Sequence, residues 1–394
     1  MANSSLMEEL VRQGSVVLEG YRHQVGGQFQ LMKFGECVCK PLVLRENKFY
    51  ESLSEELKTF TAVYHGVVSV CFERQTTGEI RVLAYPHQDI GGGSVLAKQT
   101  LKASTGFSVT SQDEERISAD GDKDYMSPWC QQCTKVSTKK LTALGDKLDT
   151  VQQEYIVLEN LTSRFTYPCI MDLKVGYGNH DDHDSEKRLR HQQIKENSTT
   201  GTLHLRLGGT QKYDASRNEF VFRNKYYGRS LSEDGFREEL RSFLHNGVRF
   251  RSELLSAIIG TLEELVDVIQ RQDSYRFFSS SLLIIYEGAE ESGCGLTSSH
   301  PHSQQNGLSQ ITDKTSTIIN GQTANGHLLN AADHMMHKAP LAVLRKRVDV
   351  RMIDFAHGVH SSFGDTPFPV GCDDDYLHGL RTLVTQFKEL LSKH

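Results

Sequence analysis

The chain of 394 residues contains no apolar run that approaches the roughly 18 residues that a membrane-spanning helix needs. Its first residues, MANSSLMEELVRQG, lack the charged-then-apolar pattern of a secretory signal. Positive charge is not in excess, since 44 Lys and Arg stand against 50 Asp and Glu and give a formal net charge of -6. These absences predict a cytoplasmic or nuclear protein, with no membrane insertion and no nucleic-acid partner.

Patterns that indicate disulfides, a structural metal or a P-loop are also scarce. Eight cysteines are spread along the chain, and Cys37 and Cys39 are too close to form a disulfide framework, which favours reduced thiols. Cys130 and Cys133 form a single CxxC without the second pair that a zinc site of this type needs, so we interpret them as incidental thiols. Glycines 91–93 lack the GK[ST] ending of a P-loop, which disfavours a Walker-type enzyme.

Two long tracts contain few large apolar residues. Residues 88–151 are rich in small polar residues, and residues 288–338 are rich in Ser, Gly, His, Gln and Asn. Such segments bury too little apolar surface to offset their ordering entropy, so we predict a variable insertion and a disordered insertion. Both are candidate contact sites for protein partners. Trp129, the sole tryptophan, is expected to pack on the folded body.

Apolar periodicity outside these tracts predicts both strands and helices. Short apolar runs indicate antiparallel hairpins before residue 87, with one helix at 45–53. Further strands are expected at 155–158, 282–286 and 348–355. Helical spacing recurs at 236–244, 254–269 and 377–391. Ser232 and Ser252 stand where N-caps of the first two of these helices are expected.

These elements predict two lobes. The expected N-lobe combines residues 16–87 with residues 152–160, after a tail at 1–15. The expected C-lobe runs from 161 to 394 and contains the second insertion. The fold class that we predict is α+β or α/β, with an antiparallel sheet in the N-lobe and a mixed C-lobe that contains substrate-binding helices.

The segment Pro168 to Gly176 holds the most informative pair of charges. Asp172 and Lys174 are two residues apart on an extended run, so their side chains project from the same face. Such a pair can bind a nucleotide hydroxyl and a transferring phosphoryl group, in a reaction where catalysis is mostly positioning and electrostatics. An exposed pair on an edge strand is the alternative interpretation.

Two further features favour phosphoryl transfer. Asp354 ends a hydrophobic strand in which it shares a face with Val350 and Met352, as the metal-holding aspartates of kinases do. Lys40 ends an N-terminal strand and Glu46 follows in the next helix, so the two can pair in the manner of a kinase phosphate grip.

The residues Pro168, Asp172, Lys174 and Gly176 form the pattern PxxxDxKxG, which resembles the signature of the inositol polyphosphate kinases. Other stretches are similar to the inositol hexakisphosphate kinase branch of that family. They include SSSLL at 279–283, KYYGR at 225–229, FLHNG at 243–247 and IDFAH at 353–357. The resemblance covers nearly the whole chain except the two tracts.

This resemblance implies a two-lobed kinase-like fold that uses ATP and magnesium. Lys40 would hold the nucleotide phosphates, with Glu46 as its partner, and the backbone of Glu159 to Leu161 would read adenine. Asp172 resembles the acid that contacts the ribose, and it counts with Lys174 among the catalytic residues. The remaining assignments are phosphate and metal positioning by Ser281 and magnesium ligation by Asp354.

The expected substrate is inositol hexakisphosphate, whose six phosphates require dense positive charge. A probable helix after the signature carries four basic residues within about 140° of one face. We therefore predict a substrate site formed by Lys174, His180, Lys187, Arg190, His191, Lys195 and His357. An ordinary solvated helix face is the alternative, and Arg206, Gln211 and Lys225 are weaker candidates.

Some positions depart from the branch pattern. Tyr177 and Gly178 stand where the branch normally has Thr and Arg, which leaves the preference among inositol polyphosphates open. The predicted activity is transfer of the ATP γ-phosphate to a phosphate of inositol hexakisphosphate, or of the pentakisphosphate, to make diphosphoinositol polyphosphates. The alternatives are a multikinase or trisphosphate kinase that acts on a ring hydroxyl, and a non-catalytic scaffold with a kinase fold.

Overall fold

The computed structural model describes residues 6–27, 29–87, 114–119, 125–178, 185–289, 347–364 and 368–393. Most of the predicted disordered insertion, and the predicted variable insertion over 88–113 and 120–124, lie outside these residues.

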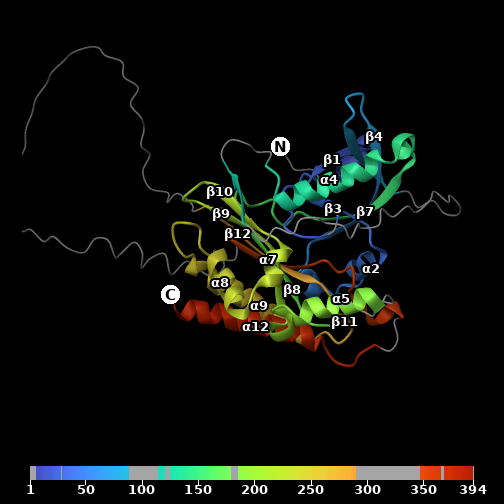
Figure 1. Ribbon diagram of the computed structural model, residues 1–394. Helices are drawn as coiled ribbons and strands as arrows, with labels where there is room; N and C mark the ends of the chain where they lie inside the picture. Colours follow the sequence, from blue (N-terminus) through green and yellow to red (C-terminus); the bar gives the residue numbers. More distant parts are fainter. Residues whose placement is uncertain are drawn as a thin grey trace, which may run out of the picture. The chain divides into compact units, whose positions relative to one another are not determined.

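The N-lobe is a closed antiparallel barrel of six strands (Figure 1). In barrel order they are β1 (Val16–Gly20), β2 (Met32–Phe34), β3 (Cys37–Pro41), β7 (Gln152–Glu159), β4 (Tyr64–Arg74) and β5 (Ile80–Pro86). Alternate residues are buried along β1, as expected for strands with one face toward a core. The barrel joins residues on both sides of the first tract, because β7 pairs with β3 and β4.

Helices add to this lobe at positions where the sequence indicated none. Helix α1 (Leu6–Gln13) occupies the stretch that we expected to be a tail, because its Leu6 and Leu10 enter the barrel core. Helix α4 (Pro128–Thr142) and the 3-10 helix η1 (Gly145–Thr150) lie within the predicted variable insertion. Leu141 of α4 and Leu148 of η1 also belong to the barrel core.

The C-lobe contains a six-stranded sheet whose neighbouring strands are all antiparallel. Its order is β13 (Val348–Ile353), β12 (Ser281–Glu287), β8 (Pro168–Val175), β9 (Leu205–Asp214), β10 (Glu219–Arg223) and β6 (Glu115–Ser118). Strand β8 is buried at almost every position, which explains its continuous apolar character. Strand β6 comes from the predicted variable insertion, so part of that stretch extends the C-lobe sheet.

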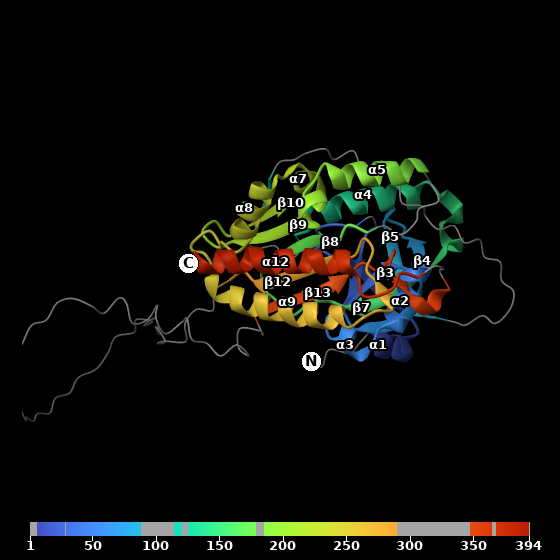
Figure 2. The ribbon, with the colours of Figure 1, turned by 90° about the horizontal axis from the view of Figure 1, so that it is seen from below.

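Three long helices accompany this sheet: α8 (Glu233–Phe243), α9 (Leu255–Gln270) and α12 (Asp374–Ser392). Figure 2 shows α9 and α12 side by side along the sheet, and the two helices contact each other. The predicted N-cap is confirmed at Ser232, whose side chain accepts from the Gly235 amide. The N-cap predicted at Ser252 is wrong, because Ser252 begins a 3-10 turn (Ser252–Leu254) and Leu254 precedes α9.

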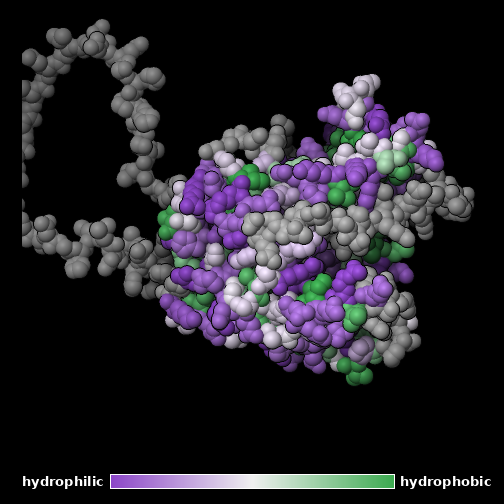
Figure 3. Space-filling view, viewed as in Figure 1, coloured by the Kyte–Doolittle hydropathy of each residue, from purple (hydrophilic) through white to green (hydrophobic). Residues whose placement is uncertain are grey.

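The remaining elements carry several of the charged residues discussed below. They are α2 (Leu44–Ser52), α3 (Glu55–Lys58), α5 (Ser185–Glu196), α6 (Thr200–Leu203), α7 (Lys225–Ser230), β11 (Tyr275–Arg276), β14 (Val359–His360) and η3 (Ser361–Phe363). Apolar residues are scattered singly over the face in Figure 3. Within the described ranges, none of the helices has the length and apolar character needed to cross a bilayer.

Candidate functional site

Four residues predicted from separate parts of the sequence meet where the two lobes touch. Lys40 of β3 places its Nζ 2.9 Å from Glu46 Oε1 of α2 and 3.0 Å from Asp354 Oδ1. The other carboxylate oxygen of Asp354 lies 2.8 Å from the Nζ of Lys174 on β8. Asp354 therefore bridges the two lysines, one from each lobe.

Asp354 reaches this position through its backbone conformation. It follows the last residue of β13 and has a φ of +66°, in the left-handed region that costs a non-glycine residue roughly 1–3 kcal/mol. Val350 and Met352 are buried on one face of β13. The expected shared face is thus incorrect for Asp354, because the strand has ended and the carboxylate turns toward the lysines.

The charges of this group support one another. Burial alone would raise the pKa of Asp354, but Lys174 and Lys40 more than offset it and hold that pKa well below its usual range. Burial would lower the pKa of Lys40, yet Asp354 and Glu46 raise it above its ordinary value. Glu46 is 1% exposed and also accepts from the Phe355 amide at 3.2 Å. The result is an ordered ion-pair network.

Asp172 lies beneath this network, buried at 7% exposure. A Cβ atom on Gly26 would lie 2.9 Å from its Oδ2, and one on Gly208 would lie 2.8 Å from its Oδ1, so both positions require glycine. Burial raises the pKa of Asp172 against the opposing charge of Lys174. Its Oδ1 has no hydrogen-bond partner within the described ranges. A buried acceptor of this kind suits a ligand hydroxyl.

Ser281 stands opposite Lys174 in the pairing of β12 with β8 and has no exposed surface. Its side chain lies beside the carboxyl group of Asp172 and counteracts the rise that burial causes in the pKa of that group. The predicted positioning of phosphates and metal by Ser281 stays a prediction.

The predicted adenine-reading segment follows β7. The Glu159 amide donates to the Val63 carbonyl at 2.8 Å, and the Asn160 amide donates to the Glu36 carbonyl at 2.8 Å. These two donors are thus engaged within the N-lobe. Within the described ranges, the Leu161 amide makes no backbone hydrogen bond outside the helices and strands, so it is a candidate contact for adenine.

A second cluster beside Lys174 consists of cations. Arg206 of β9 is paired in register with Lys174, and α7 contributes Lys225 and Arg229. Burial, and then Arg229, lower the pKa of Arg206 to about 10. Burial and Arg229 also lower the pKa of Lys225 to about 8. We call Lys195, Arg206, Lys225 and Arg229 the basic cluster.

Two buried nitrogen atoms of the basic cluster, Arg206 Nη1 and Arg229 Nε, have no hydrogen-bond partner in the described part of the chain. Buried cations that repel one another are costly, and the nearby carboxylates of Asp172 and Asp375 only partly offset this cost for Arg206 and Lys195. The basic cluster is therefore suited to a ligand with several negative charges. From the sequence, Arg206 and Lys225 are weaker candidates, and Arg229 has no individual role. The i,i+4 spacing of Lys225 and Arg229 is the pattern that indicates a shared helix face for these two cations.

The predicted substrate helix is present as α5, with a different arrangement of its basic residues. Lys195 contacts the Tyr177 carbonyl and donates to the Gly178 carbonyl at 3.2 Å, and its Nζ lies 5.2 Å from the Tyr177 ring centroid. Burial and then Arg206 lower its pKa to about 8. Lys195 therefore ties α5 to the loop after Lys174.

The other predicted substrate residues are not gathered with Lys195. Arg190 is exposed on α5, and His357 is exposed in the turn after Asp354. His180 and the side chains of Lys187 and His191 lie outside the described residues. Cys130 and Cys133 are buried free thiols, and the described residues hold no metal-type group of three His, Cys, Asp or Glu.

Comparisons with known proteins identify the family to which this chain is similar. The family model described as inositol polyphosphate kinase matches residues 155–388. The chain is 33% identical to inositol hexakisphosphate kinase 1 of Homo sapiens, across 95% of this chain and 94% of that protein. It is 33% identical to inositol hexakisphosphate kinase 2 of Homo sapiens, across 96% of each.

A solved structure is also similar. The inositol phosphate multikinase Ipk2 of S. cerevisiae, in complex with ADP and Mn2+, superposes with a TM-score of 0.50 at 18% identity. The match covers 91% of this chain and 100% of that one. At this identity the likeness concerns the fold, and it confirms the predicted kinase-like class.

Proposed function

The chain belongs to the inositol polyphosphate kinase family, and we propose that it transfers the γ-phosphoryl group of ATP to a phosphate of inositol hexakisphosphate. The product is a diphosphoinositol polyphosphate, and the pentakisphosphate is a second acceptor. Similarity over nearly full length to two hexakisphosphate kinases supports this substrate class. The observation that carries the proposal is the basic cluster beside Lys174, whose buried guanidinium atoms lack partners among the described residues.

The nucleotide is held from the N-lobe side. Lys40, fixed by Glu46 at 2.9 Å, binds the ATP phosphates. The backbone of Glu159 to Leu161 contacts adenine. Asp172 accepts a ribose hydroxyl through its buried Oδ1, which supports the nucleotide assignment because that atom otherwise has no partner within the described ranges.

The residues present also fit a divalent cation. Magnesium in kinases takes one or two carboxylates and completes its shell with phosphate oxygens and water, and when bound it neutralises phosphate charge. Asp354 is the carboxylate that would ligate it, since its oxygens face Lys40 and Lys174, which bind phosphate. Lys174 and Lys40 exchange their contacts with Asp354 for contacts with phosphate oxygens when ATP binds.

The basic cluster holds the acceptor. Its charges orient one substrate phosphate toward Lys174, which stabilises the negative charge on the transferring group. A strong general base is dispensable because the attacking oxygen is already an anion. Ser281 helps to position the phosphates and the metal, and Arg190, His357 and the basic residues outside the described part of the chain remain proposed contacts for outer phosphates.

The test is incubation of the purified protein with magnesium, ATP and inositol hexakisphosphate, with products resolved by anion exchange. We expect a more anionic product from the intact protein and none from Lys174→Ala. Arg229→Ala should raise KM for the inositol phosphate at least tenfold, since one charge-assisted contact is worth roughly 1.5–3 kcal/mol. Arg241→Ala is the matched control, because Arg241 pairs only with its helix neighbour Glu238 among the described residues.

The outcomes separate the alternatives. Turnover of a less phosphorylated inositol alone would move the assignment to a kinase that acts on a ring hydroxyl. Absence of turnover with every inositol phosphate would favour the scaffold. Location in the cytoplasm or nucleus, and protein contacts through the two tracts, are further proposals that imaging and crosslinking of the full chain would test.

A further inference from the structure

Helix α4 lies in the stretch between β5 and β7, yet its start is packed against residues that surround the site. The Ser127 amide donates to the Arg22 carbonyl at 2.9 Å, and the Ser127 hydroxyl contacts the Gln24 carbonyl. The Cys130 thiol donates to the Tyr21 carbonyl at 3.0 Å. Residues 21–26, which these contacts hold, bring Gly26 against the carboxylate of Asp172.

The second residue of α4 contacts the basic cluster directly. Trp129 is 6% exposed, and the Nζ of Lys225 lies 4.9 Å from its ring centroid. A cation at this distance over an indole is attracted by the face of the ring. The indole therefore orients the Lys225 ammonium toward the basic cluster.

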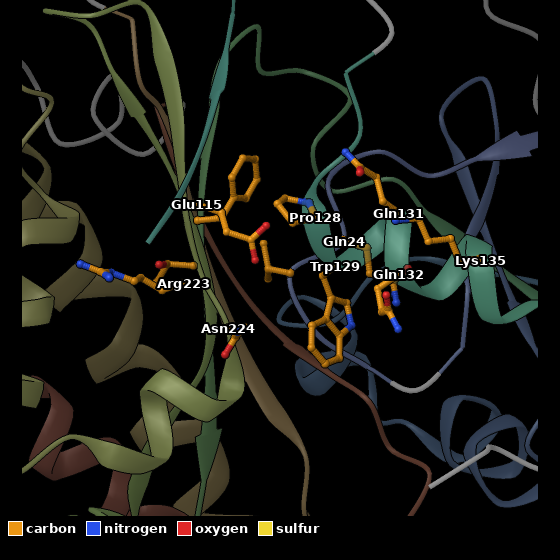
Figure 4. A pocket seen from close by; sticks show the side chains of 12 residues that line it. Gln24, Glu115, Pro128, Trp129, Gln131, Gln132, Lys135, Arg223 and Asn224 are labelled. Atoms are coloured by element: carbon orange, nitrogen blue, oxygen red, sulfur yellow. The ribbon is translucent and has the colours of Figure 1, made fainter. Parts of the chain in front are cut away.

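A cavity of about 190 Å³ adjoins this contact. Figure 4 shows Trp129 and Asn224 on its wall, with Gln24 nearby. Asn224 caps α7 by accepting from the Tyr226 amide at 2.9 Å, so it fixes the helix that carries Lys225. Open space is already present beside Trp129, so a smaller side chain there would enlarge the cavity. The Tyr226 ring, whose centroid lies 5.6 Å from the Lys225 Nζ, would then be the remaining aromatic contact of that ammonium.

We propose that Trp129 is a positioning residue for the acceptor substrate, which holds the Lys225 ammonium in the basic cluster and makes α4 part of the substrate site. This inference rests on the proposed function of that cluster. An interaction made equally in the ground state and the transition state changes KM and leaves kcat unaltered. The role of Trp129 is therefore expected to appear in KM for the inositol phosphate alone.

The experiment compares Trp129→Phe, Trp129→Leu and Leu141→Ala in the full chain. Phenylalanine keeps a ring face, leucine keeps apolar bulk only, and Leu141 is buried near the other end of α4. We expect Trp129→Leu to raise KM for inositol hexakisphosphate roughly threefold to tenfold, and Trp129→Phe to raise it less. Values of kcat and of KM for ATP should stay within about twofold. Leu141→Ala should lower Tm without changing KM.

Two further measurements separate positioning from packing. In a Lys225→Met background, the change Trp129→Leu should have almost no further effect on KM, because the contact is already lost. Trp129 is the sole tryptophan, so the tryptophan emission of the unmodified protein comes from this side chain alone. Titration with inositol hexakisphosphate should change that emission, and the change should be lost in Lys225→Met.

The outcomes distinguish this inference from the function on which it rests. Calorimetry that shows no binding of inositol hexakisphosphate to the unmodified protein would overturn both. Normal binding, together with an unchanged KM in Trp129→Leu and unaltered emission, would overturn the role of Trp129 alone. Should Trp129→Leu fail to fold, the emission titration of the unmodified protein decides, and an unresponsive tryptophan counts against the inference.

Discussion

The two charged groups that meet at Lys174 differ in how their charges are balanced. On the nucleotide side, the charges of Glu46, Lys40, Asp354 and Lys174 alternate in sign in that order, and neighbouring members are in contact within 3.0 Å. On the substrate side, burial, and then the charge of other members of the basic cluster, lowers the pKa values of Lys195, Arg206 and Lys225. The first group is ordered before any ligand arrives, whereas the second is electrostatically strained until a polyanion binds. The two groups should thus respond in opposite ways to loss of a charge.

The largest expected effect is on turnover. Asp354→Asn removes the carboxylate that joins Lys40 to Lys174 and that would ligate the metal. We expect kcat to fall at least a hundredfold, as for removal of other groups that stabilise transition-state charge. The control is Asp349→Asn on the preceding strand β13, where the carboxylate of Asp349 pairs with Arg351. Equal losses of kcat in both variants would contradict the assignment of Asp354.

The next prediction is that loss of a cation changes the free energy of unfolding in opposite directions in the two groups. Lys40→Met leaves Glu46 buried without its partner, so the free energy of unfolding should fall by about 3 kcal/mol. Arg206→Met removes a buried, repelled cation, so the free protein should be more stable by about 1 kcal/mol. Denaturant titration measures both. If the two variants change stability in the same direction, the contrast between the groups is incorrect.

Arg206→Met should also gain stability at the expense of binding. Inositol hexakisphosphate should raise the Tm of the unmodified protein, because it binds only the folded state. The same concentration should raise the Tm of Arg206→Met much less. A thermal scan with and without ligand checks this expectation, and an unchanged ligand effect would remove Arg206 from the site.

The smallest expected effect is on the number of protons that the protein takes up when the ligand binds. Lys195 and Lys225 have pKa values lowered to about 8, so each loses its proton in the free protein as pH rises through that value. A bound polyanion favours the charged forms, so binding should take up protons and weaken as pH rises above 8. Without ligand, these lysines make the folded state gain stability between about pH 8 and pH 10.5, since the unfolded chain holds more protons there.

Calorimetry in buffers of different ionisation enthalpy counts the protons. The matched variant is Lys225→Arg, which keeps a charge that does not titrate in this range. It should take up fewer protons at pH 8 than the unmodified protein. Equal uptake would show that the titration belongs to the ligand or to other residues.

Local sequence patterns predict the pairs of site residues that lie close together along the chain. Asp172 and Lys174 project from the same face because they are two residues apart on one strand. Lys40 and Glu46 lie on a strand and on the helix that directly follows it, so their pairing follows from that short connection. Arg206 and Arg229 do not follow from such patterns, because only tertiary packing tells a buried guanidinium from an exposed one. The same holds for Lys195, whose contact with the backbone at 177–178 depends on where α5 packs.

The errors at element ends have backbone causes. Asp354 was placed on a strand face because its apolar neighbours continue the alternation, while the chain in fact turns at φ +66°. Helix α1 is only 8 residues long, and helix α4 carries few apolar residues, so the local sequence indicates neither of them clearly. Their burial depends on a barrel wall that the local sequence does not reveal.

The path of the chain between the lobes has a consequence for folding during synthesis. After β5, the chain leaves the barrel and forms β6, whose sole described partner is β10. The chain then returns and closes the barrel with β7. Residue 219 of β10 follows residue 118 of β6 by 101 positions (219 minus 118). At translation rates of roughly 5–20 residues per second, β6 waits about 5–20 s for its partner. The barrel can therefore close on the ribosome while the edge of the future substrate lobe still lacks its neighbour.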